Sequence, residues 1–416
     1  MRRQHYNHDN NEMKKFTFIL TVLIVMVTAT NAQWITQTSG TTSELTSVYF
    51  TDANTGYAVG LNGTIIKTVN GGTNWTTQTS GTTTILFSVY CTDANTAYVV
   101  GGGGIILKTT NGGTNWTAQT SGTTEALRSV YFIDANTGYT VGGYSSGGVI
   151  FKTTNAGLSW TPQTSGVNYW LHSVYFVDAN TGYAVGGEST NGRIIKTVNG
   201  GTSWTVQSIP TNYAIYSVYF TDANTGYAVG NSGKILKTTN GGTNWTLQTS
   251  GTGNVLYSTN FIPQSGSNTG YAVGWNGTIR TTIDGGTNWT SQTSGTTKTL
   301  NSVYFVRQGL TNTGYAVGES GKILKTTYVG VKEIIVEKHI NIYPNPASDI
   351  LTINIDRNGN DDLILNLYSV KGLLVKTVMM KQNQQQINIS DLSKGVYLVN
   401  IISKDWSVNK RLIVKR

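Results

Sequence analysis

Residues 47–80 read SVYFTDANTGYAVGLNGTIIKTVNGGTNWTTQTS, and versions of this stretch follow one another along most of the chain. The S-V-Y-F segment, or a degenerate form of it, begins at Ser47, Ser88, Ser129, Ser173, Ser217, Ser258 and Ser302. Successive starts lie 41 or 44 residues apart. A fixed period of this length indicates one supersecondary unit that packs against its own copies. The chain therefore contains seven copies of one unit.

Each unit predicts four short strands. S-V-Y-F, G-Y-A-V-G, I-I-K-T and W-T-T-Q-T-S are rich in the β-branched and aromatic residues that strands favour. D-A-N-T and N-G-G-T-N separate them as turns, because Asn and Asp bond their own backbone and Gly adopts positive φ. Helical periodicity is absent. Four strands in roughly 40–45 residues are typical of a propeller blade, so we expect an all-β, seven-bladed β-propeller over residues 33–329.

The tryptophans predict how the ring closes. The Trp that opens the fourth strand recurs in six units, as Trp75, Trp116, Trp160, Trp204, Trp245 and Trp289. The seventh unit lacks it, and an orphan copy of the missing strand, W-I-T-Q-T, lies at residues 34–38. Closure removes exposed strand edges. We therefore expect the N-terminal strand to complete the seventh blade.

The repeat resembles known propeller families. T-V-N-G-G-T-N-W at residues 68–75 resembles the Asp-box of sialidase-like propellers, although Asp284 alone keeps the acid among six copies. Together with G-Y-A-V-G, the whole repeat most closely resembles the photosystem II stability and assembly factor-like propellers. The resemblance implies the fold but not a function, since Asp-boxes are structural turns.

The two ends predict export. Residues 1–32 have the form of a signal peptide: Lys14 and Lys15 precede an apolar run that ends before the small residue Ala32, and Met13 is an alternative start. After a linker at residues 330–339, alternating segments at 350–355, 363–369, 373–379, 386–389, 396–403 and 410–414 predict a small β-sandwich over residues 340–416.

The motifs of residues 340–416 are similar to the type A sorting domain of the type IX secretion system. They are Y-P-N-P-A-S-D at 343–349, N-L-Y-S-V-K-G at 366–372, L-S-K-G-V-Y-L-V at 392–399 and K-R-L-I-V-K-R at 410–416. The resemblance implies type IX machinery as partner, and passage through the periplasm of a Gram-negative bacterium to its surface or medium. The alternative to a sorting domain is an ordinary β-sandwich that binds a ligand.

Composition excludes several classes of partner. The net charge of +9 is concentrated in the terminal segments, and residues 33–331 carry thirteen basic and ten acidic residues without a basic cluster. We therefore expect no nucleic-acid partner. No apolar run after the signal segment is long enough to cross a membrane.

The chain has a single cysteine, Cys91, which replaces a Phe of the repeat and is therefore predicted to be a core residue. With one cysteine, no intrachain disulfide is possible. We expect a monomer.

The sequence offers little catalytic chemistry. The propeller contains one histidine, His172, which excludes His-based metal sites and triads there. Six of its ten acids lie in repeated turns, and the others are Glu44, Glu125, Glu188 and Glu319. Lys recurs in the third strand as a predicted ring of solvated side chains. We expect no enzyme, cofactor or metal; a sialidase-like or other glycoside hydrolase and a structural surface protein or assembly factor remain alternatives.

Variation between the units predicts a binding face. The D-A-N-T and N-G-G-T-N turns change little, whereas the loops that enter strand one and join strands two and three differ in every unit. These two loops share one face of a propeller, and exposed aromatic residues with polar neighbours suit a glycan or a protein. Neutral drift of the loops is the alternative. The candidate binding residues are Phe87, Arg128, Tyr144, Tyr169, Trp170, His172, Tyr213, Tyr216, Tyr257, Trp275 and Asn301.

Overall fold

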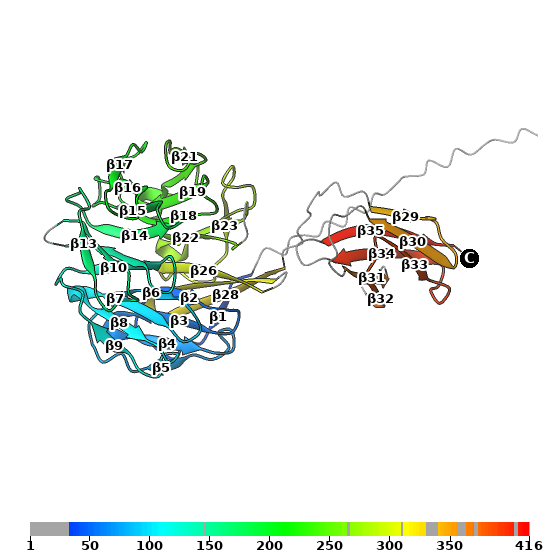
Figure 1. Cartoon of the computed structure of the whole chain (residues 1–416), viewed down its shortest axis with the longest axis horizontal. Helices are drawn as coiled ribbons and strands as arrows, with labels where there is room; N and C mark the ends of the chain where they lie inside the picture. Colours follow the sequence, from blue (N-terminus) through cyan, green and yellow to red (C-terminus); the bar gives the residue numbers. More distant parts are fainter. Residues whose placement is uncertain are drawn as a thin grey trace, which may run out of the picture. The chain divides into compact units, whose positions relative to one another are not determined.

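The computed structural model describes residues 33–144, 147–263, 267–308, 311–329, 340–355, 363–369, 373–402 and 407–415. The predicted signal peptide and linker lie outside these residues. Strands and single turns of 3-10 helix make up the regular structure of the described residues. They form two compact units, the repeats and the C-terminal strands (Figure 1).

The repeats form seven four-stranded antiparallel sheets, which are the predicted blades. The first strands are β2 (Leu45–Phe50), β6 (Leu86–Cys91), β10 (Leu127–Phe132), β14 (Leu171–Phe176), β18 (Ile215–Phe220), β22 (Leu256–Phe261) and β26 (Leu300–Gln308). The second strands are β3 (Gly56–Gly60), β7 (Ala97–Gly101), β11 (Gly138–Gly142), β15 (Gly182–Gly186), β19 (Gly226–Gly230), β23 (Gly270–Gly274) and β27 (Thr311–Gly318). First strands of neighbouring blades contact one another, as expected for strands around a central channel.

The outer half of each blade follows the same order. The third strands are β4 (Ile65–Thr68), β8 (Ile106–Thr109), β12 (Val149–Thr153), β16 (Arg193–Thr197), β20 (Ile235–Thr238), β24 (Ile279–Thr282) and β28 (Lys322–Val329). The fourth strands are β5 (Thr76–Gln78), β9 (Thr117–Gln119), β13 (Thr161–Gln163), β17 (Thr205–Gln207), β21 (Thr246–Gln248), β25 (Thr290–Gln292) and β1 (Ile35–Gln37). Five blades have a 3-10 turn between strands two and three, at η1 (Leu61–Gly63), η2 (Gly102–Gly104), η3 (Asn231–Gly233), η4 (Trp275–Gly277) and η5 (Glu319–Gly321).

The cores lie between neighbouring blades. Phe50 of blade one stacks on Tyr315 of blade seven at 3.8 Å, and the Trp75 ring meets Phe50 edge-on at 5.9 Å. Burial of one such side chain contributes about 1.5–3 kcal/mol. The G-Y-A-V-G part of each second strand is buried, which explains why this segment is apolar without a break. The repeated aromatic positions therefore hold adjacent blades together.

The N-terminal strand closes the ring, as the sequence predicts. β1 pairs antiparallel with β28, with Ile35 opposite Lys325 and Gln37 opposite Ile323. Trp34 supplies the missing Trp: its ring meets Tyr271 and Phe305 edge-on, and its Nε1 donates to the side-chain oxygen of Gln292 at 2.8 Å. The two ends of the repeat region thus share the seventh blade.

A ring of serine side chains links all seven blades. In blade one, the Val48 N–H donates to Oγ of Ser302 in blade seven at 3.3 Å. The same bond recurs from Val89 to Ser47, Val130 to Ser88, Val174 to Ser129, Val218 to Ser173, Thr259 to Ser217 and Val303 to Ser258. The Ser of S-V-Y-F is therefore a bond between blades, and one of these bonds spans the junction that β1 closes.

The recurring Lys residues are half-buried and each bonds to the next blade, so they are not the freely solvated side chains that the sequence predicts. Lys67 Nζ donates to the Gly112 carbonyl of the next blade at 2.6 Å and lies 5.5 Å from the centre of the Tyr57 ring. Lys108, Lys152, Lys196, Lys237 and Lys325 make the equivalent bond. Blade six has Thr281 instead of Lys, and its neighbour, blade seven, has no N-G-G-T-N turn to offer a carbonyl.

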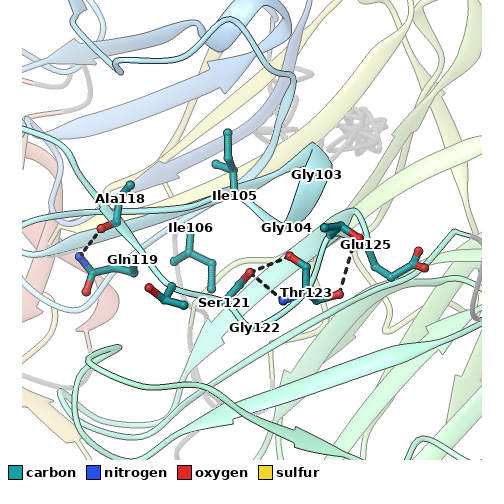
Figure 2. A pocket seen from close by; sticks show the side chains of 12 residues that line it. Gly103, Gly104, Ile105, Ile106, Ala118, Gln119, Ser121, Gly122, Thr123 and Glu125 are labelled. Carbon is teal, nitrogen blue, oxygen red and sulfur yellow. Dashed lines mark hydrogen bonds between the residues drawn. The ribbon is translucent and has the colours of Figure 1, made fainter.

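The turn after strand four leads into the next blade. Ser121 Oγ donates to the Thr123 carbonyl at 3.1 Å, and the Glu125 N–H donates to Thr123 Oγ1 at 3.0 Å (Figure 2). Gly104 of η2 lies against this turn with φ +73°, and a Cβ there would lie 1.9 Å from the Thr123 carbonyl oxygen. Only glycine permits this approach, which brings the two loops of the variable face together.

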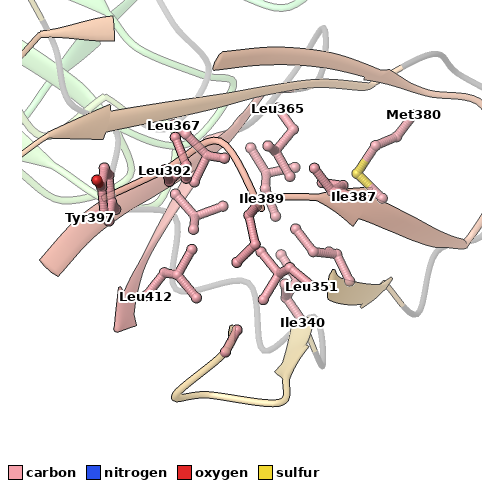
Figure 3. Close-up of a cluster of buried hydrophobic side chains, with 14 of the residues drawn as sticks. Ile340, Leu351, Leu365, Leu367, Met380, Ile387, Ile389, Leu392, Tyr397 and Leu412 are labelled. Atoms are coloured by element: carbon pink, nitrogen blue, oxygen red, sulfur yellow. The ribbon is translucent and has the colours of Figure 1, made fainter. Parts of the chain in front are cut away.

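The C-terminal unit is the predicted small sandwich of two sheets. One sheet has the order β29 (Ile340–Tyr343), β30 (Ile350–Ile355), β33 (Gln384–Asn388), and the other has β32 (Leu374–Met380), β31 (Leu363–Ser369), β34 (Gly395–Ile402), β35 (Ser407–Val414). Leu351, Leu365, Ile387 and Leu412 contribute from both sheets to one buried cluster (Figure 3). β30 and β31 have the predicted bounds, and β29 was not predicted as a strand.

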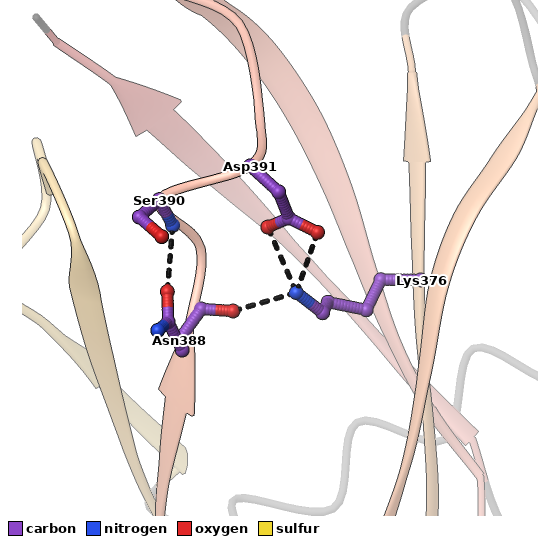
Figure 4. Close-up of polar contacts among 4 residues, drawn as sticks. All are labelled: Lys376, Asn388, Ser390 and Asp391. Carbon is purple, nitrogen blue, oxygen red and sulfur yellow. Dashed lines mark hydrogen bonds and ion pairs between the residues drawn. The ribbon is translucent and has the colours of Figure 1, made fainter.

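One ion pair joins β32 of one sheet to the turn that follows β33 of the other sheet. Lys376 of β32 donates to both Asp391 carboxylate oxygens, at 2.8 and 2.9 Å, and to the Asn388 carbonyl at 2.7 Å (Figure 4). The Ser390 N–H donates to the Asn388 side chain and orders this turn. Because Asp391 is 61% exposed, the pair contributes little stability in water.

Candidate functional site

The N-G-G-T-N turns use their own polar groups. Thr68 Oγ1 donates to Asn70 Oδ1 at 3.0 Å and accepts the Gly72 N–H at 2.9 Å, and the Asn74 N–H donates to Asn70 Oδ1. In the one acidic copy, N–H donors of Asn288 lower the pKa of Asp284. This carboxylate stabilises its turn by accepting hydrogen bonds.

The D-A-N-T turns are equally self-contained. Asp134 Oδ1 accepts the N–H groups of Asn136 and Thr137, both at 2.7 Å, and these bonds lower the pKa of Asp134. The Gly71 N–H donates to the Asn54 carbonyl, so both repeated turn types lie on one face. Within the described part of the chain, no three His, Cys, Asp or Glu side chains lie close enough to hold a metal ion.

The variable loops meet on the other face. The Leu61 N–H donates to the Glu44 carbonyl, and the Gly187 N–H donates to the Trp170 carbonyl, both at 2.9 Å. Each bond joins a loop between strands two and three to the segment that enters strand one of the same blade. The two loops that differ from blade to blade therefore form one surface.

In six blades, a β-bulge in strand one displays one variable residue at this face. In blade three, Leu127 pairs with Gly142 and Ser129 with Val141, so Arg128 has no partner in the ladder. The residues at the same bulge in five other blades are Thr46, Phe87, His172, Tyr216 and Tyr257. A bulge bends its strand and re-aims a side chain.

Five of these bulge side chains and Trp170 form a continuous row, which we call the aromatic arc: Phe87, Arg128, Trp170, His172, Tyr216 and Tyr257. The Arg128 guanidinium lies over the Phe87 ring at 5.0 Å and over the Trp170 ring at 4.9 Å. His172 contacts Tyr216 at 4.9 Å, and Tyr216 contacts Tyr257 at 5.4 Å between ring centres. The arc spans blades two to six.

The arc contains one cation and one neutral imidazole. Burial, and then the neighbouring Arg128 charge, lower the pKa of His172 to about 4, although the Gly187 carbonyl 3.1 Å from Nε2 opposes this shift. Burial also lowers the pKa of Arg128, whose guanidinium nonetheless stays charged at neutral pH. Arg128 is therefore the charged group of the arc.

Four other predicted residues lie outside the aromatic arc. Tyr144 is 66% exposed, stacks on Trp170 at 5.3 Å and accepts its indole N–H at the backbone carbonyl, so it extends the arc outward. Tyr169 and Tyr213 instead pair with cations of their own, Arg193 and Lys234, at 5.4 Å each. Trp275 is 55% exposed on η4, the 3-10 turn of blade six.

Two carboxylates, Glu44 and Glu319, lie on this face in blades one and seven. Asn301 donates to the Glu44 carboxylate at 2.8 Å and to the Leu45 carbonyl. Glu319 of η5 accepts the backbone N–H and the hydroxyl of Thr299, and these bonds lower the pKa of Glu319. The candidate set omitted both carboxylates, although they lie at the same variable positions that selected the aromatic residues.

Tyrosines of S-V-Y-F line the channel beneath. Tyr49 contacts Tyr304 at 4.6 Å and Tyr90 at 4.8 Å, and the row continues through Tyr131 and Tyr175 at spacings near 5 Å. The hydroxyls of Tyr90, Tyr131 and Tyr175 donate to carbonyls of the next blade. Because the first strands of neighbouring blades pack side by side, these ring contacts continue from blade to blade around the inner strands.

Open depressions on the outer rim carry no comparable chemistry. One of about 720 Å³ lies between the 3-10 turn and fourth strand of blade two, lined by Gly104, Gln119 and Thr123 among others (Figure 2). Equivalent hollows of about 350 Å³ and 640 Å³ occur in blades three and seven. Their recurrence shows that they follow from the repeat geometry.

Comparisons with known proteins agree with both parts of the chain. The family model described as secretion system C-terminal sorting domain matches residues 341–415. The model described as photosynthesis system II assembly factor YCF48 matches residues 26–167, 159–248 and 199–263. Both resemblances seen in the sequence are thus confirmed. No curated protein matches the chain.

Solved structures share the fold at low identity. YCF48 bound to D1 peptide is 21% identical over 71% of this chain and 95% of that chain, with a TM-score of 0.59. YCF48 from Cyanidioschyzon merolae is 21% identical over 71% and 99%, with a TM-score of 0.60. A GH74 enzyme of Niastella koreensis is 15% identical over 92% and 74%, with a TM-score of 0.58. No helix among the described residues has the length and apolar character to cross a membrane.

Proposed function

Because the chain belongs to the family of photosynthesis system II assembly factor YCF48 and ends in a type IX sorting domain, we propose that it is an exported propeller that binds a glycan or a protein without catalysis. The aromatic arc is the observation that carries this proposal. It gathers side chains from five blades on the face whose loops vary, while the repeated turns of the other face satisfy their own polar groups. The sorting domain supports a location on the cell surface or in the medium.

Two acids of the variable face, Glu44 and Glu319, favour binding over hydrolysis. A glycosidase needs one carboxyl group whose pKa is raised so that it can protonate the leaving group. Hydrogen bonds from Thr299 instead lower the pKa of Glu319, and Glu44 accepts from Asn301. The GH74 likeness is one of fold at 15% identity. A glycoside hydrolase therefore has less support than a binding protein.

The YCF48 structure with a bound D1 peptide supports a protein as the second candidate ligand. A protein ligand would keep the same working face, because aromatic side chains at the centre of a patch also dominate protein interfaces.

An array of glycans and peptides tests the proposal with the purified full chain. Loss of an aromatic anchor typically costs about 1–3 kcal/mol of binding, or roughly 5- to 150-fold in affinity. Trp170→Ala and Tyr216→Ala should each weaken the best ligand by that amount with little change in melting temperature. Asn111→Ala, in a turn of the opposite face, should lower the melting temperature and leave affinity unchanged. Affinity lost in Asn111→Ala but kept in both aromatic variants would place the ligand on the other face.

A further inference from the structure

The half-buried cation of the aromatic arc has no anionic partner. Among the described residues, no carboxylate forms an ion pair with Arg128, and its Nε–H is buried without a hydrogen-bond acceptor. Removing a charge and a donor from water without a partner is unfavourable. The Phe87 and Trp170 rings stabilise the cation through their faces but cannot accept its N–H groups in the guanidinium plane.

The position of Arg128 suits a planar anion with a single charge. Contacts with two rings hold the guanidinium in place, and its fork of N–H donors matches the two oxygens of a carboxylate. The cations nearest in the loops, Arg193 and Lys234, lie over Tyr169 and Tyr213. Arg128 is thus the sole charge of the arc, too little for a highly charged ligand.

The rest of the variable face around Arg128 suits the hydroxyls and the ring of a sugar. Trp170, Tyr216 and Tyr257 offer aromatic surface beside Arg128. Glu44 and Glu319 lie in blades one and seven, which complete the ring beyond Tyr257, and carboxylate oxygens accept hydrogen bonds from hydroxyls. The same two carboxylates would repel a peptide with several acidic side chains.

We propose that the ligand is a glycan that carries a carboxylate, a uronate, and that Arg128 binds this carboxylate while the arc stacks on the sugar rings. The inference rests on the proposed binding function and adds the chemical class of the ligand. The binding involves no covalent step.

Calorimetric titration of the full chain with three oligosaccharides that each carry a single uronate tests the inference: a xylo-oligosaccharide with one glucuronate branch, a hyaluronan disaccharide and a neutral oligosaccharide that ends in one galacturonate. At least one should bind, and its fully methyl-esterified form should bind roughly 10- to 100-fold more weakly, as expected for loss of a charged hydrogen-bond partner. Arg128→Gln should show the same loss. Arg128→Lys should fall in between, because Lys keeps the charge and loses the planar fork. Arg411→Gln, at an exposed position of the sorting domain, is the charge-matched control and should bind like the wild type.

Three outcomes overturn the inference: no uronate binds, the esterified oligomer binds equally well, or folded Arg128→Gln keeps its affinity. If Arg128→Gln melts early, the ester comparison with the wild-type chain still decides. If uronates fail but a neutral glycan or an acidic peptide binds and is lost in Trp170→Ala, the uronate is wrong and the binding face stands. If nothing binds through this face, both proposals fail.

Discussion

Lys152 contributes to the packing of blades, although the sequence alone predicts that its side chain is a solvated surface charge. Its Nζ donates to the Gly200 carbonyl at 2.8 Å and lies 5.4 Å from the centre of the Tyr139 ring, while the Tyr139 hydroxyl donates to the same carbonyl at 2.7 Å. One carbonyl of the next blade thus accepts two bonds. The Lys and Tyr side chains of one blade therefore both donate hydrogen bonds to the backbone of the turn in the neighbouring blade.

Lys152→Met should lower the free energy of unfolding by about 1–2 kcal/mol, because it removes a charge-assisted hydrogen bond and a cation–π contact but keeps the apolar stem. Chemical denaturation measures this change. Lys298→Met is the control, since Lys298 is exposed. Thr281→Lys should not gain stability, because blade seven has no turn to bind the new ammonium. Equal stability of Lys152→Met and Lys298→Met would contradict a role between blades.

His172 should make the propeller less stable in mild acid. Its folded-state pKa is lowered to about 4, by burial first and by Arg128 second, against about 6.5 in the unfolded chain. The unfolded state therefore binds more protons between these values, and stability falls as pH decreases from 6.5 to 4. The charged and titratable groups that face His172 are Arg128 and Tyr216.

Melting temperatures measured from pH 7 to pH 4 check this expectation. His172→Gln should lose less stability over the window than the wild type. The turn aspartates with lowered pKa values act mainly below this range and are present in both proteins. Parallel curves for the two proteins would show that His172 protonates as easily in the folded state as in the unfolded state.

Strand β1 shows that three residues can complete a blade. It lies at the edge of the seventh sheet, and its first two residues are exposed, so its own burial contributes little. Trp34, next to it, is buried between Tyr271 and Phe305. The strand positions this side chain and covers the edge of β28.

A chain that begins at Gly40 should melt at a much lower temperature than one that begins at Gln33, or should aggregate, because β28 becomes an exposed edge. The single change Trp34→Ala should cost about 3–5 kcal/mol, as for other buried tryptophans. Ile35→Ala is the control, since Ile35 is 57% exposed. Differential scanning calorimetry compares the variants, and equal melting temperatures for the two chain lengths would reject closure by β1.

The sorting domain and the repeats differ in how they are built. The C-terminal sandwich buries its own cluster, which includes Leu351, Leu365 and Leu412. The propeller strands bury theirs between blades. Because each unit has a core of its own, removal of one need not unfold the other.

A chain that ends at Val331 should fold but fail to leave the periplasm of a host with type IX secretion. The reason is that the matched sorting domain, residues 341–415, is absent. Cell fractionation with a protease-resistance assay measures both location and folding. Arrival of the truncated chain at the cell surface in normal amounts would mean that residues 340–416 do not direct export.

The sequence by itself determined the blade count, the closure by residues 34–38 and the sorting domain. Each of these depends on short local patterns, such as S-V-Y-F and W-T-x-Q-T, that repeat or match within a few residues. Strand bounds followed closely in β30 and β31, where alternation is regular. β29 was missed, because its four residues run into the proline-containing Y-P-N-P segment.

Tertiary structure alone decided what the repeated and variable residues contact. Lys67 and the Gly112 carbonyl are 45 residues apart, and Val48 and Ser302 are 254 apart, so no local pattern indicates their bonds. The sequence proposed a variable face, but which of its residues meet depends on the bulge that turns Arg128 toward Phe87 and Trp170. Such contacts form when the ring closes, because closure sets the distance and angle between neighbouring blades.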